Sequence, residues 1–369
     1  MQINELTLTG YRNYSNQTVR FIDGINVIYG SNAQGKTNLI EAVFYLATGR
    51  SFRNAADKDL INFDCENANI LAKIMSGGRQ QTLEARFCRG RRRVLIANDV
   101  KLKKASELSG RLNVVEFGPD DLNLVKEGAA VRRKLMDNCL SQLRPGYLTA
   151  LTEFNKLYEN KTRILRDHFD KPSLLELLDD FNERLIIQSA KIIKYRSAFV
   201  KSLSQKAADI HYDFSGGIEK LSVEYKTVND MPAAEMNSEG ILNELHKHQA
   251  DKYQAELRSG LCLSGCHKDD ILIDINETPA RKFASQGQAR TASISLKLAE
   301  RDIHFDDKGE YPVLLLDDVL SELDYHRRGY ILSKIENGQV LITTCEDTAF
   351  SDSYDNAMIK VENGIIIRS

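Results

Sequence analysis

The eight residues Gly30-Ser31-Asn32-Ala33-Gln34-Gly35-Lys36-Thr37 decide the fold. They match the pattern G-x-x-x-x-G-K-[ST] at every required position, between a short apolar run, Ile25 to Tyr29, and a helical run, Asn38 to Leu46. In this pattern the backbone N–H groups of the loop and the amino end of the helix hold phosphate oxygens, because both present positive partial charge. The stretch therefore predicts a strand, a phosphate-binding loop and a helix, with Lys36 on the β- and γ-phosphates of a nucleotide and Thr37 on Mg²⁺.

A second stretch, far downstream, supplies the acidic partner of the loop. The apolar run Val313 to Leu316 is followed by Asp317 and Asp318. Because Mg²⁺ needs a carboxylate opposite the threonine hydroxyl, we assign Asp317 to the metal. Asp318 is then placed to orient or deprotonate an attacking water. The long separation between the loop and these acids predicts an insertion between them.

A third stretch, Ser285-Gln286-Gly287-Gln288, precedes a helical pattern from Ala289 to Ala299. Taken alone, a serine beside a glycine at a helix start fits either an anion-binding terminus or an ordinary capped helix. Its order in the chain is more informative, since the acidic strand follows it and Ser321-Glu322-Leu323-Asp324 comes next. This is the order of the signature loop, the acidic strand and the D-loop in ABC-type ATPases. A P-loop kinase has no use for the Ser285 stretch.

A transporter ATPase would show a histidine after the strand Val340 to Thr343. The sequence has none there, so that switch position falls to Thr343 or Thr344.

The composition of the chain excludes several classes of protein. The 369 residues carry 50 Lys+Arg against 52 Asp+Glu, a net charge of −2, which excludes a basic coat over the whole chain. A 42% hydrophobic and 28% charged composition is typical of a globular protein. The sequence has no apolar run of about 18 residues, and Met1 to Glu5 do not resemble a signal peptide, so we expect a cytoplasmic protein without a membrane span. Cys262 and Cys266 lack a second ligand pair, which favours reduced thiols over a structural zinc.

The periodicity of apolar residues changes twice along the chain. Strand-like alternation fills both ends, with hairpins around Asn98-Asp99 and Asn363-Gly364. From Pro119 to Tyr253 the periodicity is helical, and a heptad-like apolar stripe runs from Leu174 to Leu203. The sequence predicts an α/β head formed by residues 1–118 and 259–369 (lobe I), with a helical insertion of residues 119–258 (lobe II).

These motifs together resemble the RecF family of bacterial recombination and repair ATPases, which is related to the SMC family. The resemblance covers nearly the whole chain and is carried by Tyr11–Tyr14, Gly30–Asn38, Val114–Leu122, Arg132-Arg133, Gly265–Asp270, Ser285–Arg290 and Leu314–Asp324. The sequence departs from the family pattern at three positions. Ala33 replaces a glycine, Cys266 a proline and Lys268 an arginine.

The resemblance implies an ABC-type P-loop ATPase head of mixed sheets and helices with an inserted helical second lobe. It implies ATP and Mg²⁺ as cofactors and an ATP-dependent head-to-head homodimer, in which Ser285 of a second subunit caps the γ-phosphate and slow hydrolysis releases the pair. The expected catalytic residues are Asp318, Lys36 and Ser285, and the expected metal ligands are Thr37 and Asp317. The expected nucleotide-binding residues are Gly30, Ser31, Asn32, Ala33, Gln34, Gly35, Lys36, Thr37, Asn38, Arg12, Gln286 and Gly287.

Two basic clusters suggest a nucleic-acid partner. They comprise Arg89, Arg91, Arg92, Arg93, Lys101, Lys103 and Lys104 on a predicted hairpin, and Lys191, Lys194, Arg196 and Lys201 on the predicted long helix. Taken alone, each cluster also fits a solvated face.

The resemblance implies binding of single-stranded, gapped or junction DNA, weak DNA-stimulated ATPase activity and recombination mediator proteins as partners. It further implies roles in recombinase loading, replication recovery and SOS induction. The alternative is a nucleotide-gated scaffold that recruits a protein and for which hydrolysis is incidental. For His267 a catalytic or nucleotide-sensing role and a structural role both stay open.

Overall fold

The chain forms two compact units in the computed structural model, which describes residues 1–345 and 357–368. Unit 1 comprises Met1–Asn123 and Ser293–Ser369, and unit 2 comprises Leu124–Ala292. The head and insertion bounds predicted from sequence differ from this division, because residues 259–292 group with unit 2 and residues 119–123 group with unit 1. Within the described residues, no helix is long and apolar enough to cross a membrane.

The first sheet of unit 1 is antiparallel, with strand order β2-β1-β4-β5-β6-β7. Its first strands alternate between buried and open positions, so Leu6 and Leu8 enter the core while Thr7 does not. Asn98 and Asp99 both have positive φ, at 49° and 62°, and make the predicted tight turn between the last two strands. The strands are β1 (Gln2–Tyr11), β2 (Tyr14–Arg20), β4 (Asn67–Ser76), β5 (Arg79–Cys88), β6 (Val94–Ala97) and β7 (Val100–Lys101).

The second sheet of unit 1 carries the predicted loop and acids. Its order is β15-β14-β3-β13-β12-β8, and all neighbours are parallel except the terminal hairpin β14–β15. Strands β12 and β13 are buried along their whole length, as expected for parallel strands covered on both faces. The strands are β3 (Ile25–Tyr29), β8 (Val114–Phe117), β12 (Val313–Asp317), β13 (Val340–Thr344), β14 (Ala357–Glu362) and β15 (Ile365–Arg368).

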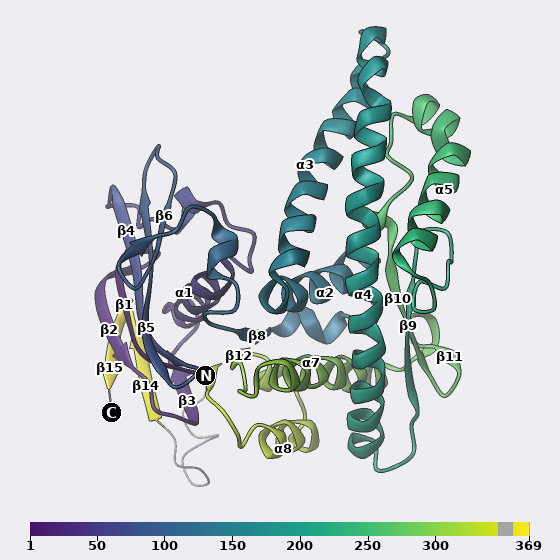
Figure 1. Cartoon of the computed structure of the whole chain (residues 1–369). Helices are drawn as coiled ribbons and strands as arrows, with labels where there is room; N and C mark the ends of the chain where they lie inside the picture. Colours follow the sequence, from purple (N-terminus) through teal and green to yellow (C-terminus); the bar gives the residue numbers. More distant parts are fainter. Residues whose placement is uncertain (346–356, 369) are drawn as a thin grey trace. The chain divides into compact units, whose positions relative to one another are not determined.

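Helix α1 (Lys36–Thr48) packs against strands of both sheets of unit 1 (Figure 1). Its residues from Leu39 to Ala47 are almost all buried and join one hydrophobic core with side chains from both sheets. Because α1 starts directly after β3, this packing fixes the loop between them. The remaining elements of unit 1 are η1 (Asp57–Leu60), η2 (Ala105–Leu108), η3 (Pro119–Asn123), η6 (Leu320–Glu322) and α8 (Tyr325–Lys334).

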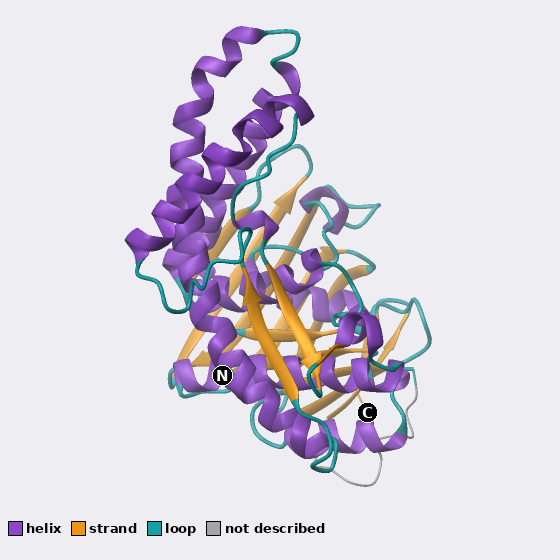
Figure 2. Cartoon of the chain, turned by 90° about the vertical axis from the view of Figure 1, so that its right-hand side faces the viewer, coloured by secondary structure: helices purple, strands orange, loops and turns teal. Residues whose placement is uncertain are grey.

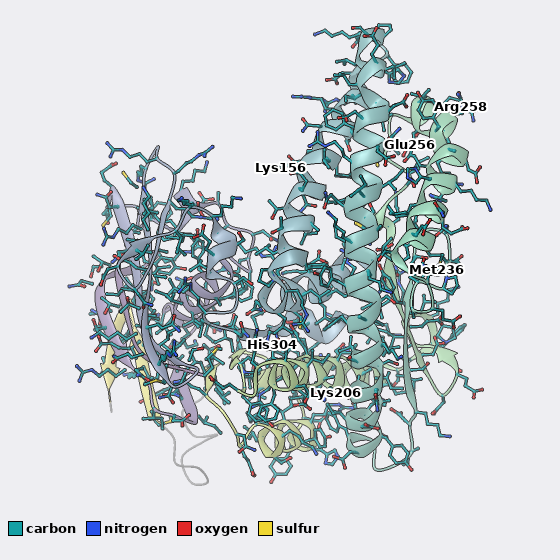
Figure 3. All side chains as sticks on the ribbon, viewed as in Figure 1. Lys156, Lys206, Met236, Glu256, Arg258 and His304 are labelled. Carbon is teal, nitrogen blue, oxygen red and sulfur yellow. The ribbon has the colours of Figure 1, made fainter. Side chains whose placement is uncertain are left out.

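Unit 2 is built on a long helical hairpin. Helices α3 (Pro145–Asp167) and α4 (Leu178–Phe214) lie side by side (Figures 1 and 2), and the 37 residues of α4 span roughly 55 Å. Helix α2 (Ala129–Leu143) precedes them, and α5 (Ser238–Ser259) packs along α4. Glu256 of α5 (Figure 3) forms a buried ion pair with Lys161 of α3 at 2.8 Å, which ties the two helices together.

Unit 2 also contains a three-stranded sheet in which one strand was not predicted. Its order is β11-β10-β9, where β9 (Leu221–Lys226) pairs antiparallel with β10 (Asp270–Ile275), and β11 is Thr278–Pro279. The alternation of β9, with Leu221 and Val223 buried and Ser222 and Glu224 exposed, was a readable signal inside the stretch interpreted as helical. This pairing is also why residues beyond 258 group with unit 2.

The remaining elements complete the order. They are η4 (Pro172–Leu177), η5 (Cys266–Lys268), α6 (Ala280–Phe283) and α7 (Gln286–Lys308). The division between the units falls within α7.

Candidate functional site

The loop between β3 and α1 leaves the amino end of the helix open. Gly30, Ala33 and Gly35 have φ values of 147°, 63° and 117°, and no side chain caps Gly35 at the helix start. A Cβ at Gly30 would lie 2.3 Å from the backbone oxygen of Val361, so only glycine fits there. An uncapped helix start can hold an anion, because its free N–H groups and the positive end of the helix dipole both attract negative charge.

Residues of the Tyr11–Tyr14 motif and of the terminal hairpin, whose role the sequence did not show, hold this loop by hydrogen bonds to its carbonyl oxygens. The Asn13 amide donates to the Gln34 carbonyl oxygen at 2.8 Å, and the Tyr14 hydroxyl donates to the Gly35 carbonyl oxygen at 2.9 Å. The backbone N–H of Gly364, in the terminal hairpin, also donates to the Gln34 oxygen, at 3.1 Å. These bonds fix the loop conformation without using its inward N–H groups.

Lys36 is a buried cation without a counter-charge. Lys36 is only 6% exposed. Its Nζ donates to the carbonyl oxygens of Gly30 at 2.6 Å and Ser31 at 2.8 Å. It forms no ion pair with any described residue. Since a buried ammonium without an anionic partner is costly, this arrangement fits a site for phosphate oxygens.

Cys345, just after β13, also reaches the loop. Its Sγ lies 3.7 Å from Lys36 Nζ and donates to Asn32 Oδ1 at 2.8 Å. The switch position was expected at Thr343 or Thr344. Thr343 contacts Asp317 of the acidic strand, and its role as the switch position stays a prediction.

Thr37, Asp317 and Thr343 meet in one hydrogen-bonded group. The hydroxyls of Thr37 and Thr343 donate to Asp317 Oδ1 at 2.9 and 2.8 Å. Burial raises the pKa of Asp317, although both hydroxyl bonds act against that rise. The Thr37 hydroxyl and the Asp317 carboxylate could hold a divalent cation between them, because both are oxygen ligands of the kind Mg²⁺ prefers.

Asp318 is held in an unusual backbone conformation. Its φ is 55°, in the left-handed region that non-glycine residues seldom adopt. Its N–H donates to Thr343 Oγ1 at 2.9 Å, and its carboxylate Oδ1 accepts from the Ser321 hydroxyl at 2.9 Å. The first residue of the predicted D-loop thus orients the carboxylate expected to act on water. The last, Asp324, caps α8 by accepting from the backbone N–H of Arg327 at 2.9 Å.

Two arginines lie near the loop. Arg12, predicted to bind nucleotide, forms a two-pronged ion pair with the fully buried Glu41 of α1, through bonds of 2.9 and 2.8 Å. Arg53, which the sequence analysis did not single out, donates to Asn38 Oδ1 at 3.2 Å, and its charge weakly opposes the rise that burial causes in the pKa of Asp317. Arg53 therefore lies close enough to the acidic strand to sense its charge.

In unit 2, Ser285 starts α7 with a reciprocal cap. Gln288 N–H donates to Ser285 Oγ at 3.2 Å, while Ser285 N–H donates to Gln288 Oε1 at 2.9 Å, which is a capping box. The Gln288 amide also donates to Glu219 Oε1 at 2.8 Å. Ser285 and Gln286 are exposed and Gly287 is half-buried. The loop is thus preformed, with its serine open to a binding partner.

Comparisons with known proteins identify the family of the chain. The model of the RecF/RecN/SMC N terminal domain family matches residues 2–367. The chain is 37% identical to the DNA replication and repair protein RecF of Acetivibrio thermocellus over 99% of both chains. It is 35% identical to that of Clostridioides difficile, over 100% of this chain and 98% of the relative. The chain belongs to the RecF family.

Solved structures give the same result. A structure of the recombination mediator protein RecF-ATP in the RecFOR pathway superimposes with a TM-score of 0.87 at 33% identity, covering 100% of this chain and 97% of the other. An Smc head domain from Pyrococcus furiosus matches with a TM-score of 0.55 at 15% identity, covering 99% of this chain and 94% of the other, and shares the fold. As a RecF-family member, the chain is an ATP-binding DNA replication and repair protein with an ABC-type ATPase fold.

The segment Gly265–Asp270, which carried part of the RecF resemblance, belongs to a buried polar network in unit 2. Arg196 of α4 is 2% exposed and donates to Asp269 Oδ2 at 3.0 Å and Asp137 Oδ1 at 2.8 Å. Arg132 forms a two-pronged pair with Asp270 at 2.7 and 2.9 Å. The prediction that Arg196 belongs to a basic surface was wrong, because two carboxylates from distant parts of the chain enclose it.

His267 lies in the same RecF-family segment. Its Nε2 is 3.1 Å from the Cys262 carbonyl oxygen, Nδ1 is buried without a hydrogen-bond partner, and its ring contacts those of Phe154 and Tyr158. Burial lowers its pKa to about 4. This environment is that of a neutral, packed histidine, and Cys262 and Cys266 beside it are free and buried.

In the predicted basic hairpin, some basic side chains are bound within the chain and others are exposed. Arg89 donates to the carbonyl oxygens of Cys65 and Asn62, and Arg93 pairs with Asp57 at 3.0 Å. The exposed basic side chains that remain are those of Arg91, Arg92, Lys101, Lys103 and Lys104.

Proposed function

We propose that this RecF-family chain is an ATP-dependent switch that dimerises on ATP and binds DNA. One observation carries the proposal: the buried Lys36 ammonium, at an uncapped helix start, lacks a counter-charge within the described chain. An anion that supplies this charge removes the cost of burying the ammonium. A triphosphate supplies it, as the ATP in the solved RecF structure suggests.

The residues divide the work of hydrolysis. The loop N–H groups and Lys36 would bind phosphate oxygens, and the Thr37 hydroxyl and the Asp317 carboxylate would hold Mg²⁺. Burial raises the pKa of Asp317, and two hydroxyl donors support its negative charge. Mg²⁺–ATP, when bound, supplies the phosphoryl group that passes to water. Asp318, oriented by Thr343 and Ser321, accepts the proton of that water.

The partner subunit completes the site. Ser285, Gln286 and Gly287 of one copy face the phosphates bound by the other copy, since the capping box leaves the serine exposed at a preformed helix start. Such an arrangement stabilises the dimer only through contacts that ADP lacks, so slow hydrolysis releases it.

DNA is the proposed polyanionic partner of the dimer. The exposed Arg91, Arg92, Lys101, Lys103 and Lys104 supply phosphate contacts, which do not depend on the base sequence. Single-stranded, gapped or junction DNA is the form of DNA that the RecF resemblance implies. Binding to such sites supports recombinase loading together with mediator proteins, recovery of replication and SOS induction.

Light scattering with and without a non-hydrolysable ATP analogue tests the dimer. We expect the mass to double with the analogue. Ser285→Arg should leave ATP affinity unchanged and keep the protein monomeric, whereas Glu159→Arg, on the exposed side of α3, should still dimerise. Analogue-induced dimers of Ser285→Arg would contradict the shared site.

Fluorescence anisotropy with a labelled gapped duplex tests the DNA contacts. Affinity should fall steeply as salt rises, and the double variant Arg91→Ala/Arg92→Ala should reduce the slope of log affinity against log salt by about 2. A salt-independent affinity would contradict phosphate binding.

A further inference from the structure

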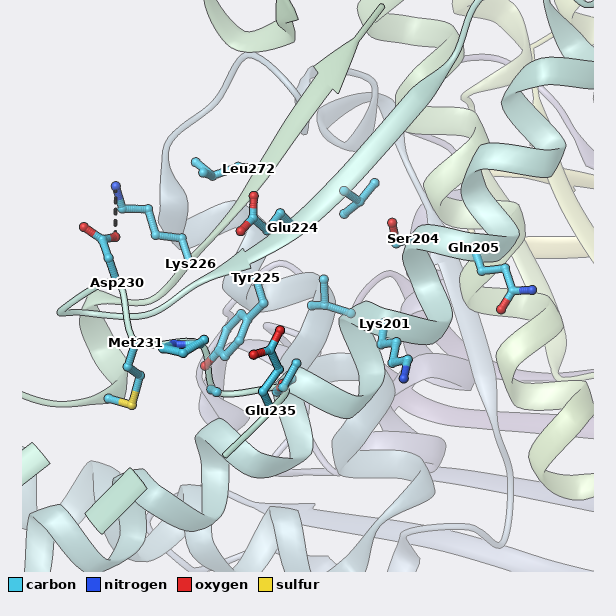
Figure 4. A pocket seen from close by; sticks show the side chains of 16 residues that line it. Lys201, Ser204, Gln205, Glu224, Tyr225, Lys226, Asp230, Met231, Glu235 and Leu272 are labelled. Atoms are coloured by element: carbon cyan, nitrogen blue, oxygen red, sulfur yellow. Dashed lines mark ion pairs between the residues drawn. The ribbon is translucent and has the colours of Figure 1, made fainter. Parts of the chain in front are cut away.

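The open edge of β9 borders a groove in unit 2 (Figure 4). Strand β9 ends the sheet order β11-β10-β9, and among the described residues no strand pairs with its other side. The groove, of about 620 Å³, lies between β9, helix α4 and the segment from Asp230 to Glu235. Its volume lies within the range of ligand sites in proteins.

The backbone of β9 offers unpaired hydrogen-bonding groups to this groove. Asn276 N–H donates to the Lys220 oxygen at 2.9 Å. Hydrogen-bonded pairs alternate along an antiparallel ladder, so the pairs of Ser222 and Glu224 with β10 are also hydrogen-bonded. Val223 and Tyr225 therefore direct their N–H and C=O groups toward the open edge. Such a row is a template for another strand.

The walls of the groove are fixed before any partner arrives. Lys194 of α4 donates to the carbonyl oxygen of Met236 (labelled in Figure 3) at 2.9 Å, and Thr227 Oγ1 donates to that of Met231 at 3.3 Å. The Tyr225 hydroxyl donates to Asp269 at 2.5 Å and anchors the strand itself. A preformed groove loses little conformational freedom on binding, which favours affinity.

The lining has an apolar floor and an excess of unpaired negative charge. The apolar side chains of the floor are those of Val200, Val223, Met231 and Ala233, whereas Leu272, which is 41% exposed, lies opposite Glu224 in the β9–β10 ladder and so on the other face of the sheet. Lys226 and Asp230 neutralise each other at 3.3 Å. Glu224 and Glu235 have no ion-pair partner within the described chain, and of the lysines in the lining Lys201 alone is likewise unpaired.

We propose that this groove binds an extended segment of a partner protein, which adds a strand beside β9 and has an apolar–basic–apolar pattern. Val223 and Tyr225 lie on the face that packs on α4, so partner residues opposite them enter the apolar floor. The residue between them lies beside Glu224 on the other face, where a lysine or arginine makes a favourable cross-strand pair.

A peptide pair tests the charge preference. Two fluorescein-labelled peptides, with the cores Thr-Val-Lys-Val-Thr and Thr-Val-Glu-Val-Thr, are titrated with the full chain and followed by anisotropy. We expect saturable binding of the lysine peptide, with the glutamate peptide up to about fivefold weaker.

Glu224→Lys should reverse the order of the two peptides, and Glu159→Lys on α3 should keep it. No saturable binding of either peptide, or an unchanged order in Glu224→Lys, would overturn the proposal.

Methylation of single peptide nitrogens tests the strand geometry. Affinity should drop at alternate positions, because only every second N–H faces β9. Hydrogen exchange at the amides of Val223 and Tyr225 should slow when the lysine peptide is bound. Equal losses at all positions would indicate a helical or irregular ligand. Self-association of the chain that the lysine peptide fails to displace would indicate that a second copy fills the edge. Either result would overturn the proposal.

Discussion

Lys36 in unit 1 and Arg196 in unit 2 are both buried cations, yet their surroundings differ in one respect. Arg196 is enclosed by the carboxylates of Asp137 and Asp269 and by the Tyr147 hydroxyl. Among the described residues, the Lys36 ammonium donates to two carbonyl oxygens and a thiol and forms no ion pair. A buried cation that is neutralised by carboxylates stabilises the fold, whereas a buried cation without a counter-charge favours binding of an anion. Lys36 and Asp269, the partner of Arg196, both lie in segments that carry the RecF resemblance, and the surroundings of each cation distinguish a structural role from a binding role.

Removing the neutralised cation should have the largest effect. Arg196→Met leaves the fully buried Asp269 and the half-buried Asp137 without their cation, so we expect the free energy of unfolding to fall by about 3 to 5 kcal/mol. Urea unfolding followed by circular dichroism measures it. Lys201→Met, on the exposed face of the same helix, should change it by less than about 0.5 kcal/mol. Equal effects of the two variants would remove the distinction drawn between the two cations.

Removing the cation that lacks a counter-charge should leave stability nearly unchanged and abolish ATP binding. For Lys36→Met we expect at least a hundredfold loss of affinity by isothermal titration, which is about 2.7 kcal/mol or more. Lys101→Met, on the exposed strand β7, should bind ATP normally. Normal ATP affinity in Lys36→Met would show that the loop is not the triphosphate site.

Asp318→Asn should separate binding from chemistry. Because the amide cannot accept the proton from water, we expect turnover to fall by about a hundredfold at unchanged ATP affinity. Asp120→Asn, an exposed carboxylate on η3, serves as the matched control in a phosphate-release assay. If Asp318→Asn cells still repair DNA, the protein acts as a nucleotide-gated scaffold. If repair fails while dimers form, hydrolysis is the switch.

The pH dependence of stability tests the structural role assigned to His267 in unit 2. Burial lowers its pKa to about 4 from an ordinary 6.5, so the unfolded chain binds more protons between these two values. Stability from this group is therefore present above pH 6.5 and is lost as the pH falls toward 4, by about 2 kcal/mol at pH 5.

The variant His267→Gln should flatten this part of the pH profile of the unfolding free energy while ATP turnover stays normal. An unaltered profile would contradict the packed, neutral histidine. A loss of turnover would restore a catalytic or nucleotide-sensing role.

Local features of this structure could be predicted from the sequence. The loop, the acidic strand, the hairpins at Asn98 and Asn363 and the start of α7 follow from short patterns, because turn and capping residues act over a few positions. Strand β9 was missed although its alternation was readable, since the helical runs on both sides masked six residues.

Contacts between distant segments could not be predicted. Nothing near Arg196 in the sequence shows that Asp137 and Asp269 neutralise it, and nothing near Gln34 shows that Asn13 and Gly364 hold it. The same holds for Arg12, whose Glu41 partner lies 29 residues away. Periodicity reports which face of an element is buried and gives no information on what that face meets.

Cys345 gives the molecule a built-in reporter position. It is the one exposed cysteine of the six, and its sulfur lies 3.7 Å from the Lys36 ammonium. Cys65 and Cys88 are half-buried and the other three cysteines are buried, so a maleimide dye should react fastest with Cys345, beside the phosphate loop. Its rate of attachment should drop when a nucleotide shields the thiol, so occupancy can be followed in real time without engineering a label.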